Sequence, residues 1–166
     1  ILVKGAGDLA TGVIARLSRS GFRVVAIEIP QPTVIRRTVA LAQAVYDGQF
    51  SVEEIRGRCV SPDLVDETLR QGVIPILVDP LAESIGRLCP QVVVDAIVAK
   101  RNLGTRITDA PLVIALGPGF TVGVDCHVIV ETNRGHYLGR VIHTGAAEPD
   151  TGLPGEIAGH GWDRVL

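Results

Sequence analysis

The 166-residue sequence predicts an α/β protein with a Rossmann-like, doubly wound and mostly parallel sheet, extended near its C-terminal end by an antiparallel β-hairpin. Three observations predict this fold. Apolar β-branched runs alternate with amphipathic segments of helical period along most of the chain. A glycine-rich turn joins the first apolar run directly to the first helical segment. From Cys126 onward the pattern changes to two short apolar runs around a polar turn, which is typical of a hairpin.

The N-terminal third predicts a βαβ unit followed by a second helix. A strand over 1–4 precedes a helix over 8–20, in which apolar residues recur at helical spacing. The β-branched run over 22–29 predicts a buried parallel strand, because a crossover helix separates it from the first strand. A second amphipathic helix is expected over 33–47.

The middle of the chain continues the alternation of strands and helices. We expect a weak alternating strand over 51–60, a short helix over 61–72 and a strand over 73–79. Pro75 cannot donate a hydrogen bond to a neighbouring strand, so the last of these strands is bulged or begins after it. A further short helix is expected over 80–90, with its proline in the first turn.

Two further strands and the hairpin complete the prediction. The strands cover 91–98 and 112–117, and the hairpin turn lies near 133–135. We expect a Rossmann-like nucleotide-binding core over 1–125 and a hairpin and loop extension over 126–166. Because the chain starts without Met and ends on a strand-like stretch, we expect the extension to continue into a C-terminal segment beyond this sequence.

Composition narrows the classes of partner and the compartment. The net charge is −2 and like charges do not cluster, so neither nucleic acid nor an anionic membrane is an expected partner. No apolar run approaches the roughly 18 residues needed to span a bilayer. Three cysteines without paired spacing fit reduced thiols. We therefore expect a cytoplasmic protein.

The turn after the first strand predicts a phosphate-binding loop. Gly5, Gly7 and Ala10 form a G-x-G-x-x-A pattern between a strand and a helix, where glycine permits a tight turn and close approach of a phosphate. The amides at the helix start, near Thr11, would bind the anion. Glu28 stands where a carboxylate bonds a ribose hydroxyl. The alternative is that the glycines only make a tight turn.

Asp8 complicates the phosphate prediction. Its carboxylate follows the second glycine, so it would repel a pyrophosphate, although the same group is favourable as a helix cap and through the helix dipole. A nucleotide remains the expected ligand, and a methyl-donor cofactor with a cationic end is an alternative to NAD.

Polar residues and glycines after two later strands extend the predicted site. The strand over 91–98 and the residues after it place Asp95, Lys100, Arg101 and Asn102 near the same rim, and either Lys100 or Arg101 is suited to neutralise a phosphate. Gly117 ends the strand over 112–117 and Gly119 follows it, and both can direct backbone amides toward an anion. The alternatives are a solvated loop with a structural aspartate and a turn without a ligand.

The histidines do not predict a metal site. Their spacing matches no zinc pattern, and neighbouring residues of a strand point to opposite faces. We therefore expect no metal, and we expect Cys126 to be a buried, inert thiol. The histidines considered are His127, His136, His143 and His160.

Four long stretches, taken together, resemble the YqeB-type proteins, which are accessory proteins of the selenium-dependent molybdenum hydroxylase system. The resemblance spans nearly the whole chain and implies a Rossmann-like first half, similar to xanthine dehydrogenase accessory proteins. It also implies longer relatives that continue into a β-rich segment. It carries no established catalytic residues. The stretches are VKGAGDLATGVIARLSRSGFRVVAIEIPQPTVIRRTVALAQAVYDG, DAIVAKRNLGT, VIALGPGFTVGVDCHVIVETNRGHYLGRVI and GLPGEIAGHGWDRVL.

The resemblance implies an accessory or maturation factor that assembles or inserts a selenium-containing molybdenum cofactor. Its implied partners are a nucleotide or molybdopterin-type cofactor and the apo-enzyme of a molybdenum hydroxylase, and a homo-oligomer is compatible with this role. The alternatives are an NAD(P)- or S-adenosylmethionine-dependent enzyme that uses the same glycine loop, and an interaction module whose loops bind nothing. The sequence shows no clear pair of residues for proton transfer beside a hydride site.

Overall fold

The computed structural model describes residues 1–153 and 159, and the chain divides into two units, Ile1–Ile97 and a second unit that begins at Val98. The predicted boundary between 125 and 126 stays a prediction. The end of the predicted C-terminal loop and His160 lie outside the described residues.

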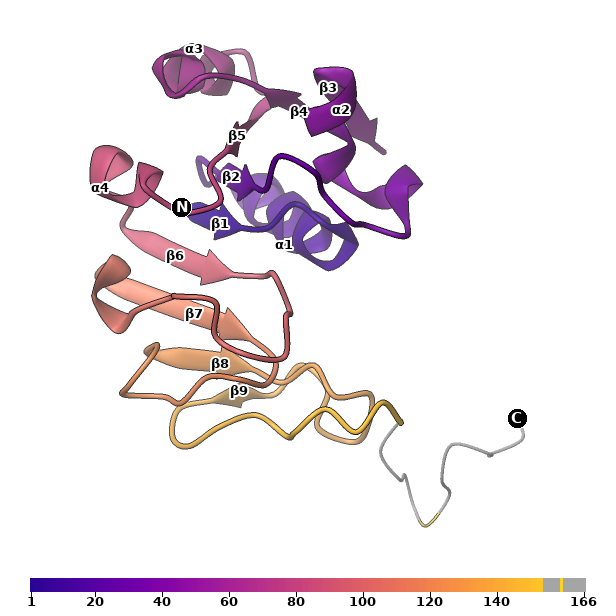
Figure 1. The fold of residues 1–166 in the computed structure, drawn as a ribbon, viewed down its shortest axis with the longest axis vertical. Coiled ribbons are helices and arrows are strands. Elements are labelled where there is room, and N and C mark those ends of the chain that lie inside the picture. The colour runs from indigo at the N-terminus through magenta and orange to yellow at the C-terminus, as the bar shows by residue number, and fades with distance from the viewer. Residues whose placement is uncertain (154–158, 160–166) are drawn as a thin grey trace. The chain divides into compact units, whose positions relative to one another are not determined.

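The first unit is built on a sheet with the strand order β3-β4-β5-β2-β1-β6 (Figure 1). All neighbouring pairs in this sheet are parallel except β3 and β4, which are antiparallel. This confirms a mixed α/β fold with mostly parallel strands. The strands are β1 (Leu2–Lys4), β2 (Val25–Glu28), β3 (Gln49–Val52), β4 (Ile55–Cys59), β5 (Ile74–Val78) and β6 (Val92–Asp95).

The predicted βαβ unit at the N-terminus is confirmed. Helix α1 (Asp8–Arg19) begins four residues after β1 and buries Ala10 and Ile14 against the core. Its charges suit the helix dipole, with an acidic residue in the first turn and arginines in the last. The parallel strands β1 and β2 are in register from Leu2↔Val25 to Lys4↔Ile27.

The predicted helix over 33–47 is wrong, because the chain folds there into two 3₁₀ turns and a single-turn helix. Ala40 has an extended backbone (φ −126°, ψ 119°), which interrupts any continuous helix. After this residue, a backbone amide forms a hydrogen bond outside the segment: Ala42 N donates to Ala6 O of the glycine turn over 2.8 Å. Tertiary hydrogen bonds therefore replace helical ones. The elements are η1 (Arg37–Val39), η2 (Leu41–Gln43) and α2 (Ala44–Asp47).

The predicted single strand over 51–60 is also wrong, since β3 and β4 form a tight hairpin. Glu53 in the turn has a positive φ of 52°. The register runs from Gln49↔Arg58 to Val52↔Ile55. The turn consists of Glu53 and Glu54, without the glycine, proline or asparagine typical of a hairpin turn, so the pattern did not reveal the reversal of the chain.

The strand β5 contains Pro75, contrary to the expectation of a bulge or a later start. Pro75 pairs in register with Arg58 of β4, whereas the pairing with β2 begins one residue later, at Ala26↔Ile76. The missing N–H is tolerated because the β2 side of the ladder has not yet begun there. Before this strand, the expected helix is confirmed as η3 (Pro62–Leu64) and α3 (Val65–Arg70).

Helix α4 (Ser84–Leu88) begins later than predicted, and Pro80 is not in its first turn. The carboxylate of Asp79, at the end of β5, accepts hydrogen bonds from the amides of Glu83 and Ser84 over 3.0 and 2.7 Å. These bonds satisfy amides at the start of the helix and fix where it begins.

The second unit contains β7 (Leu112–Leu116), β8 (Val128–Val130) and β9 (Val141–Ile142), preceded by η4 (Ile107–Asp109) (Figure 1). The first two strands are parallel, and β8 and β9 form the predicted antiparallel hairpin. The hairpin is confirmed, with a longer connection than a tight turn.

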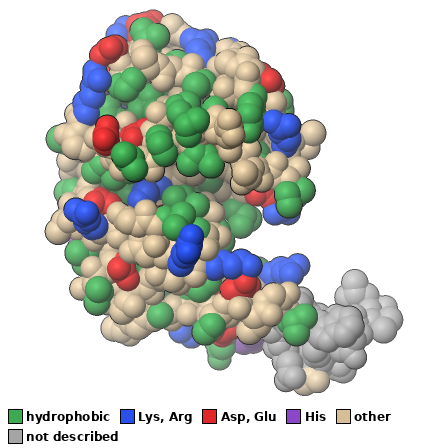
Figure 2. Space-filling model, viewed as in Figure 1, with side chains coloured by type: hydrophobic (Ala, Val, Ile, Leu, Met, Phe, Trp, Pro, Cys, Tyr) green, Lys and Arg blue, Asp and Glu red, His purple; other side chains and the backbone are tan. Residues whose placement is uncertain are grey.

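The core of the first unit consists of aliphatic side chains from its central strands, including Val3, Ile76 and Val93, all fully buried. Apolar side chains also lie across the middle of the face of this unit seen in Figure 2, with charged side chains toward its margin. Among the described residues, no helix has the length and apolar character that crossing a membrane would need.

Candidate functional site

The glycine turn after β1 is a close-packed reversal of the chain. Gly5 has a φ of +94°, and a Cβ there would lie 3.4 Å from Ala96 O and from the backbone of Ile97. Gly7 has φ −63° and ψ −177°, which any residue adopts, and a Cβ there would lie 3.6 Å from Val34 Cγ2. The turn requires glycine at position 5 because of its positive φ. At position 7 the absence of a side chain leaves room in front of the backbone amides.

Helix α1 begins at this turn without a side-chain cap. Gly7 is the N-cap residue, so no side chain satisfies the first amides of the helix. The carboxylate of Asp8 points to the guanidinium of Arg36, and the two form an ion pair. Asp8 is therefore neutralised by a cation from the loop after β2, which weakens the repulsion expected from the sequence.

Glu28 lies beside the glycine turn, as its position at the end of β2 predicted. Its Oε1 accepts a hydrogen bond from Ala6 N over 3.0 Å, and its Oε2 accepts one from Ile29 N over 2.7 Å. The carboxylate therefore holds the turn directly. Each oxygen keeps a further lone pair for a ligand hydroxyl.

Thr11, another predicted site residue, is committed to the fold. Its hydroxyl donates to Ala6 O over 3.2 Å and accepts from Leu41 N over 2.9 Å, and its residue is 3% exposed. The side chain ties the glycine turn to η2. This is a structural role that the sequence spacing did not indicate.

Asp95 forms a buried ion pair with Lys4 that the sequence analysis missed. Lys4 Nζ lies 3.9 Å from Asp95 Oδ2, and both side chains are almost fully buried. Asp95 Oδ1 also accepts from Ile97 N over 3.1 Å. The signal in the sequence was a lysine that ends an otherwise apolar strand, in a parallel sheet that places it beside the end of β6.

In the second unit, Lys100 and Asn102 have partners of their own. Lys100 forms an ion pair with Asp150 and donates a hydrogen bond to its carboxylate. This hydrogen bond and a second one from Gly152 N hold the pKa of Asp150 below its usual range. Asn102 Nδ2 donates to Asp125 Oδ1 over 3.0 Å, and Asn102 Oδ1 accepts from Thr105 N. Asn102 therefore organises its own loop.

Gly117 and Gly119 are required by packing. Both have positive φ, +77° and +103°. A Cβ at Gly117 would collide with Thr132 Oγ1, and a Cβ at Gly119 would collide with the backbone of Arg101. These close approaches explain both glycines without a ligand, and a role in anion binding stays a prediction.

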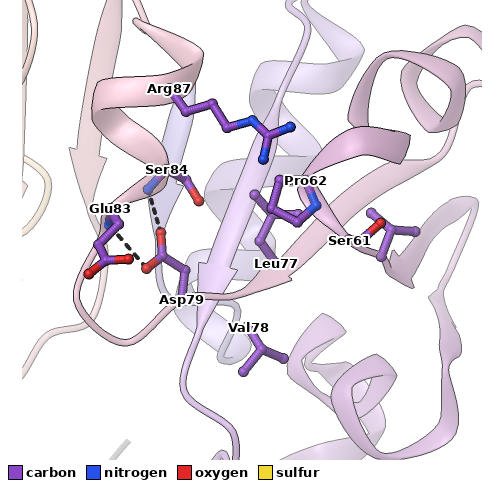
Figure 3. Close-up of a pocket in the computed structure, with 9 residues that line it drawn as sticks. Ser61, Pro62, Leu77, Val78, Asp79, Glu83, Ser84 and Arg87 are labelled. Atoms are coloured by element: carbon purple, nitrogen blue, oxygen red, sulfur yellow. Dashed lines mark hydrogen bonds between the residues drawn. The ribbon is translucent and has the colours of Figure 1, made fainter.

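Asp79 is a strand-end carboxylate that the sequence analysis did not select. Partial burial raises its pKa, but hydrogen bonds from Ser84 and the Glu83 amide outweigh burial, so the pKa lies below its usual value. A pocket of about 420 Å³ lies beside it. Figure 3 shows this pocket between α4 and the start of η3, with the end of β5 between them.

The histidines and Cys126 have structural surroundings. His127 Nδ1 accepts from Val113 N over 3.0 Å, which pins β7 to the residue before β8. Cys126 is fully buried, as expected. In the part of the chain that the structure describes, no three His, Cys, Asp or Glu side chains gather to hold a metal.

The predicted site residues separate into two groups. In the first unit they lie at or after the carboxyl ends of β1, β2 and β6, at one edge of the sheet: Gly5, Gly7, Asp8, Thr11, Glu28 and Asp95. The other four, Lys100, Asn102, Gly117 and Gly119, belong to the second unit. That the two groups serve one ligand stays a prediction.

Together, the parallel sheet and its glycine turn define an α/β protein with a candidate ligand site at the carboxyl edge of the sheet. The chain is 52% identical, over 167 aligned residues, to the Uncharacterized protein YqeB of Escherichia coli (strain K12). The alignment covers 100% of this chain and 31% of that relative, which confirms the YqeB-type resemblance. The chain thus spans about a third of the length of the curated relative. No protein-family model and no solved structure matches it.

Proposed function

We propose that the first unit binds a nucleotide, or the nucleotide-bearing part of a molybdopterin-type cofactor, at the turn formed by Gly5–Asp8. In this proposal the fold is Rossmann-like and doubly wound, and the bound group is a phosphate at the start of α1. The observation that carries the proposal is the position of this turn. It joins β1 to an uncapped helix of 12 residues, at the strand that lies between β2 and β6.

The order of the strands explains why this position favours a ligand. Going along the chain, the sheet grows from β1 to β2 and β5 on one side, and then returns to add β6 on the other side. Loops at such a switch point diverge and leave a crevice at the carboxyl ends of the strands. A helix N-terminus that opens into the crevice attracts an anion.

The contacts of Glu28 and Asp8 define how the ligand would lie. Because Glu28 already accepts from Ala6 N, a phosphate would bind the amides that open α1. The remaining lone pairs of Glu28 would accept a sugar hydroxyl. Arg36, which is paired with Asp8, would lie close enough to the helix start to contribute positive charge.

The YqeB-type resemblance supports the biological role that we propose. The proposed protein is an accessory factor that assembles or inserts the cofactor of a selenium-dependent molybdenum hydroxylase, with the apo-hydroxylase as its macromolecular partner and the cytoplasm as its location. The residues named above hold the ligand, and no catalytic step is assigned to them.

The experiment is identification of the ligand. Protein purified under native conditions is examined by mass spectrometry for a co-purified molecule, and thermal unfolding is measured with NAD, NADP, S-adenosylmethionine and pterin nucleotides. A molybdopterin-type or other nucleotide that raises the unfolding temperature supports the proposal. Selective stabilisation by S-adenosylmethionine or NAD(P), with turnover, indicates an enzyme. No stabilisation by any of them contradicts nucleotide binding.

A further inference from the structure

The pocket between α4 and η3 lies at the same edge of the first unit's sheet as the Gly5–Asp8 turn. Its volume, about 420 Å³, is in the range of small-molecule sites. One wall is apolar and comes from Pro62, Leu77 and Val78 (Figure 3). The opposite side carries Ser84 and Arg87 from α4. The pocket therefore combines an apolar wall with a guanidinium and with the carboxylates of Asp79 and Glu83, which also line it.

The guanidinium of Arg87 is the polar group best placed to bind a ligand here. It forms an ion pair with Asp63 of η3, and the two side chains are 55% and 78% exposed. Such exposed pairs contribute little to stability, about 0–1 kcal/mol. Another carboxylate or phosphate can therefore replace Asp63 as the partner of Arg87 at small cost.

The neighbouring carboxylate of Asp79 does not compete for this cation. Both of its oxygens accept amide hydrogen bonds from the start of α4, and Ser84 adds a side-chain hydrogen bond. Its charge is thus compensated by amides four and five residues later in the chain, and Figure 3 shows these bonds between Asp79 and the start of α4. Among the described residues, Asp63 alone forms an ion pair with the guanidinium of Arg87.

We propose that this pocket binds a small organic oxyanion, a carboxylate or phosphate attached to a compact apolar body. The oxyanion pairs with Arg87 in place of Asp63, and the apolar body packs against Pro62 and Val78. A guanidinium matches either oxyanion with two parallel hydrogen bonds. In this arrangement Asp63 is an internal competitor that the ligand displaces. The inference concerns a site apart from the Gly5–Asp8 turn and does not rest on the proposed function.

The test uses phenyl phosphate and benzoate as probes, titrated into isotope-labelled protein and followed by amide NMR shifts and calorimetry. We expect saturable shifts at Val78, Ser84 and Arg87. The Arg87→Gln variant should bind at least about tenfold more weakly, because a charged hydrogen-bond pair is lost. Asp63→Asn should bind about two- to fivefold more tightly, because the competitor is removed. In the Arg87→Gln background, Asp63→Asn should have no effect.

Matched controls separate this site from general charge effects. Arg23 and Asp66 form a similar exposed ion pair elsewhere in the first unit, so Arg23→Gln should leave the affinity unchanged. Inorganic phosphate should bind more weakly than phenyl phosphate, since it lacks the apolar body. Thermal unfolding verifies that each variant is folded.

Three results would overturn the inference. These are shifts confined to the Gly5–Asp8 turn, an affinity insensitive to Arg87→Gln, and an Asp63→Asn variant that binds no more tightly than the parent. A probe preference for phosphate over carboxylate, or the reverse, identifies the head group within the proposed class.

Discussion

The carboxylate of Glu28 accepts a hydrogen bond from the backbone N–H of Ala6 over 3.0 Å, so the end of β2 holds the glycine turn that follows β1. Ala6 is fully buried, and its amide has no access to water. Glu28, which the sequence predicts to bind a ligand, thus also supports the glycine turn. The two roles are separable by experiment.

Glu28→Ala should destabilise the first unit, because it leaves the buried amide of Ala6 without an acceptor. An unsatisfied buried donor costs about 1–3 kcal/mol. Glu28→Gln keeps one acceptor oxygen and should cost less. Denaturant unfolding measures the free energy of unfolding of both variants. Equal stability of Glu28→Ala and the parent would mean that the hydrogen bond does not support the turn.

Glu28→Ala should also weaken the binding of a ribose-containing ligand, by about 1.5–3 kcal/mol of binding free energy in the folded variant.

The affinity for a phosphate should decrease from the parent protein to Gly7→Ala, and again from Gly7→Ala to Gly7→Val. Its backbone angles suit any residue and a Cβ has ordinary room, so the fold should persist with a cost of about 0.5–1 kcal/mol at the N-cap. Added carbon atoms would keep a phosphate from the amides. Gly12→Ala, at a helical position with open space, is the control and should leave affinity unchanged. A folded Gly7→Val protein with parental affinity would falsify the phosphate-loop assignment.

Asp79→Ala should destabilise the start of α4 by about 1 kcal/mol, as does loss of a helix cap. The folded pKa of Asp79 lies below its unfolded value of about 3.9, so the ionised carboxylate stabilises the protein fully above that pH. This stabilisation is lost as the pH falls through the folded pKa. Unfolding free energies of parent and variant should therefore differ near neutral pH and converge in acid. A difference independent of pH would exclude this origin.

Lys100→Gln tests whether the second unit contributes to the proposed site. Lys100 forms an exposed ion pair with Asp150, and such pairs contribute little to stability. If the prediction that both groups of residues serve one ligand is correct, Lys100→Gln lowers the affinity for a phosphate-bearing ligand and flattens its dependence on salt. Asp150→Asn breaks the same pair but keeps the cation, and it should leave affinity unchanged or raise it. Unchanged affinity and salt dependence in Lys100→Gln would remove this lysine from the site.

The prediction from sequence succeeded where structure is local. The strand over 1–4, the helix that begins at Asp8 and the glycine turn between them follow from spacing over a few residues. It failed over 33–47, where helical spacing is present but Ala42 bonds to Ala6 in the glycine turn. It also failed at the β3–β4 reversal, where the turn consists of two glutamates and contains no glycine.

The sequence by itself determined the βαβ unit at the N-terminus and the glycine turn at the start of α1, because hydrophobic period and glycine content act over a few residues. Only the tertiary structure decided which strand ends lie together. It paired Lys4 with Asp95, directed Glu28 to Ala6, and brought Arg87 to Asp63 across a pocket. These contacts join residues 22 or more positions apart, and nothing in the local pattern of either partner specifies the other.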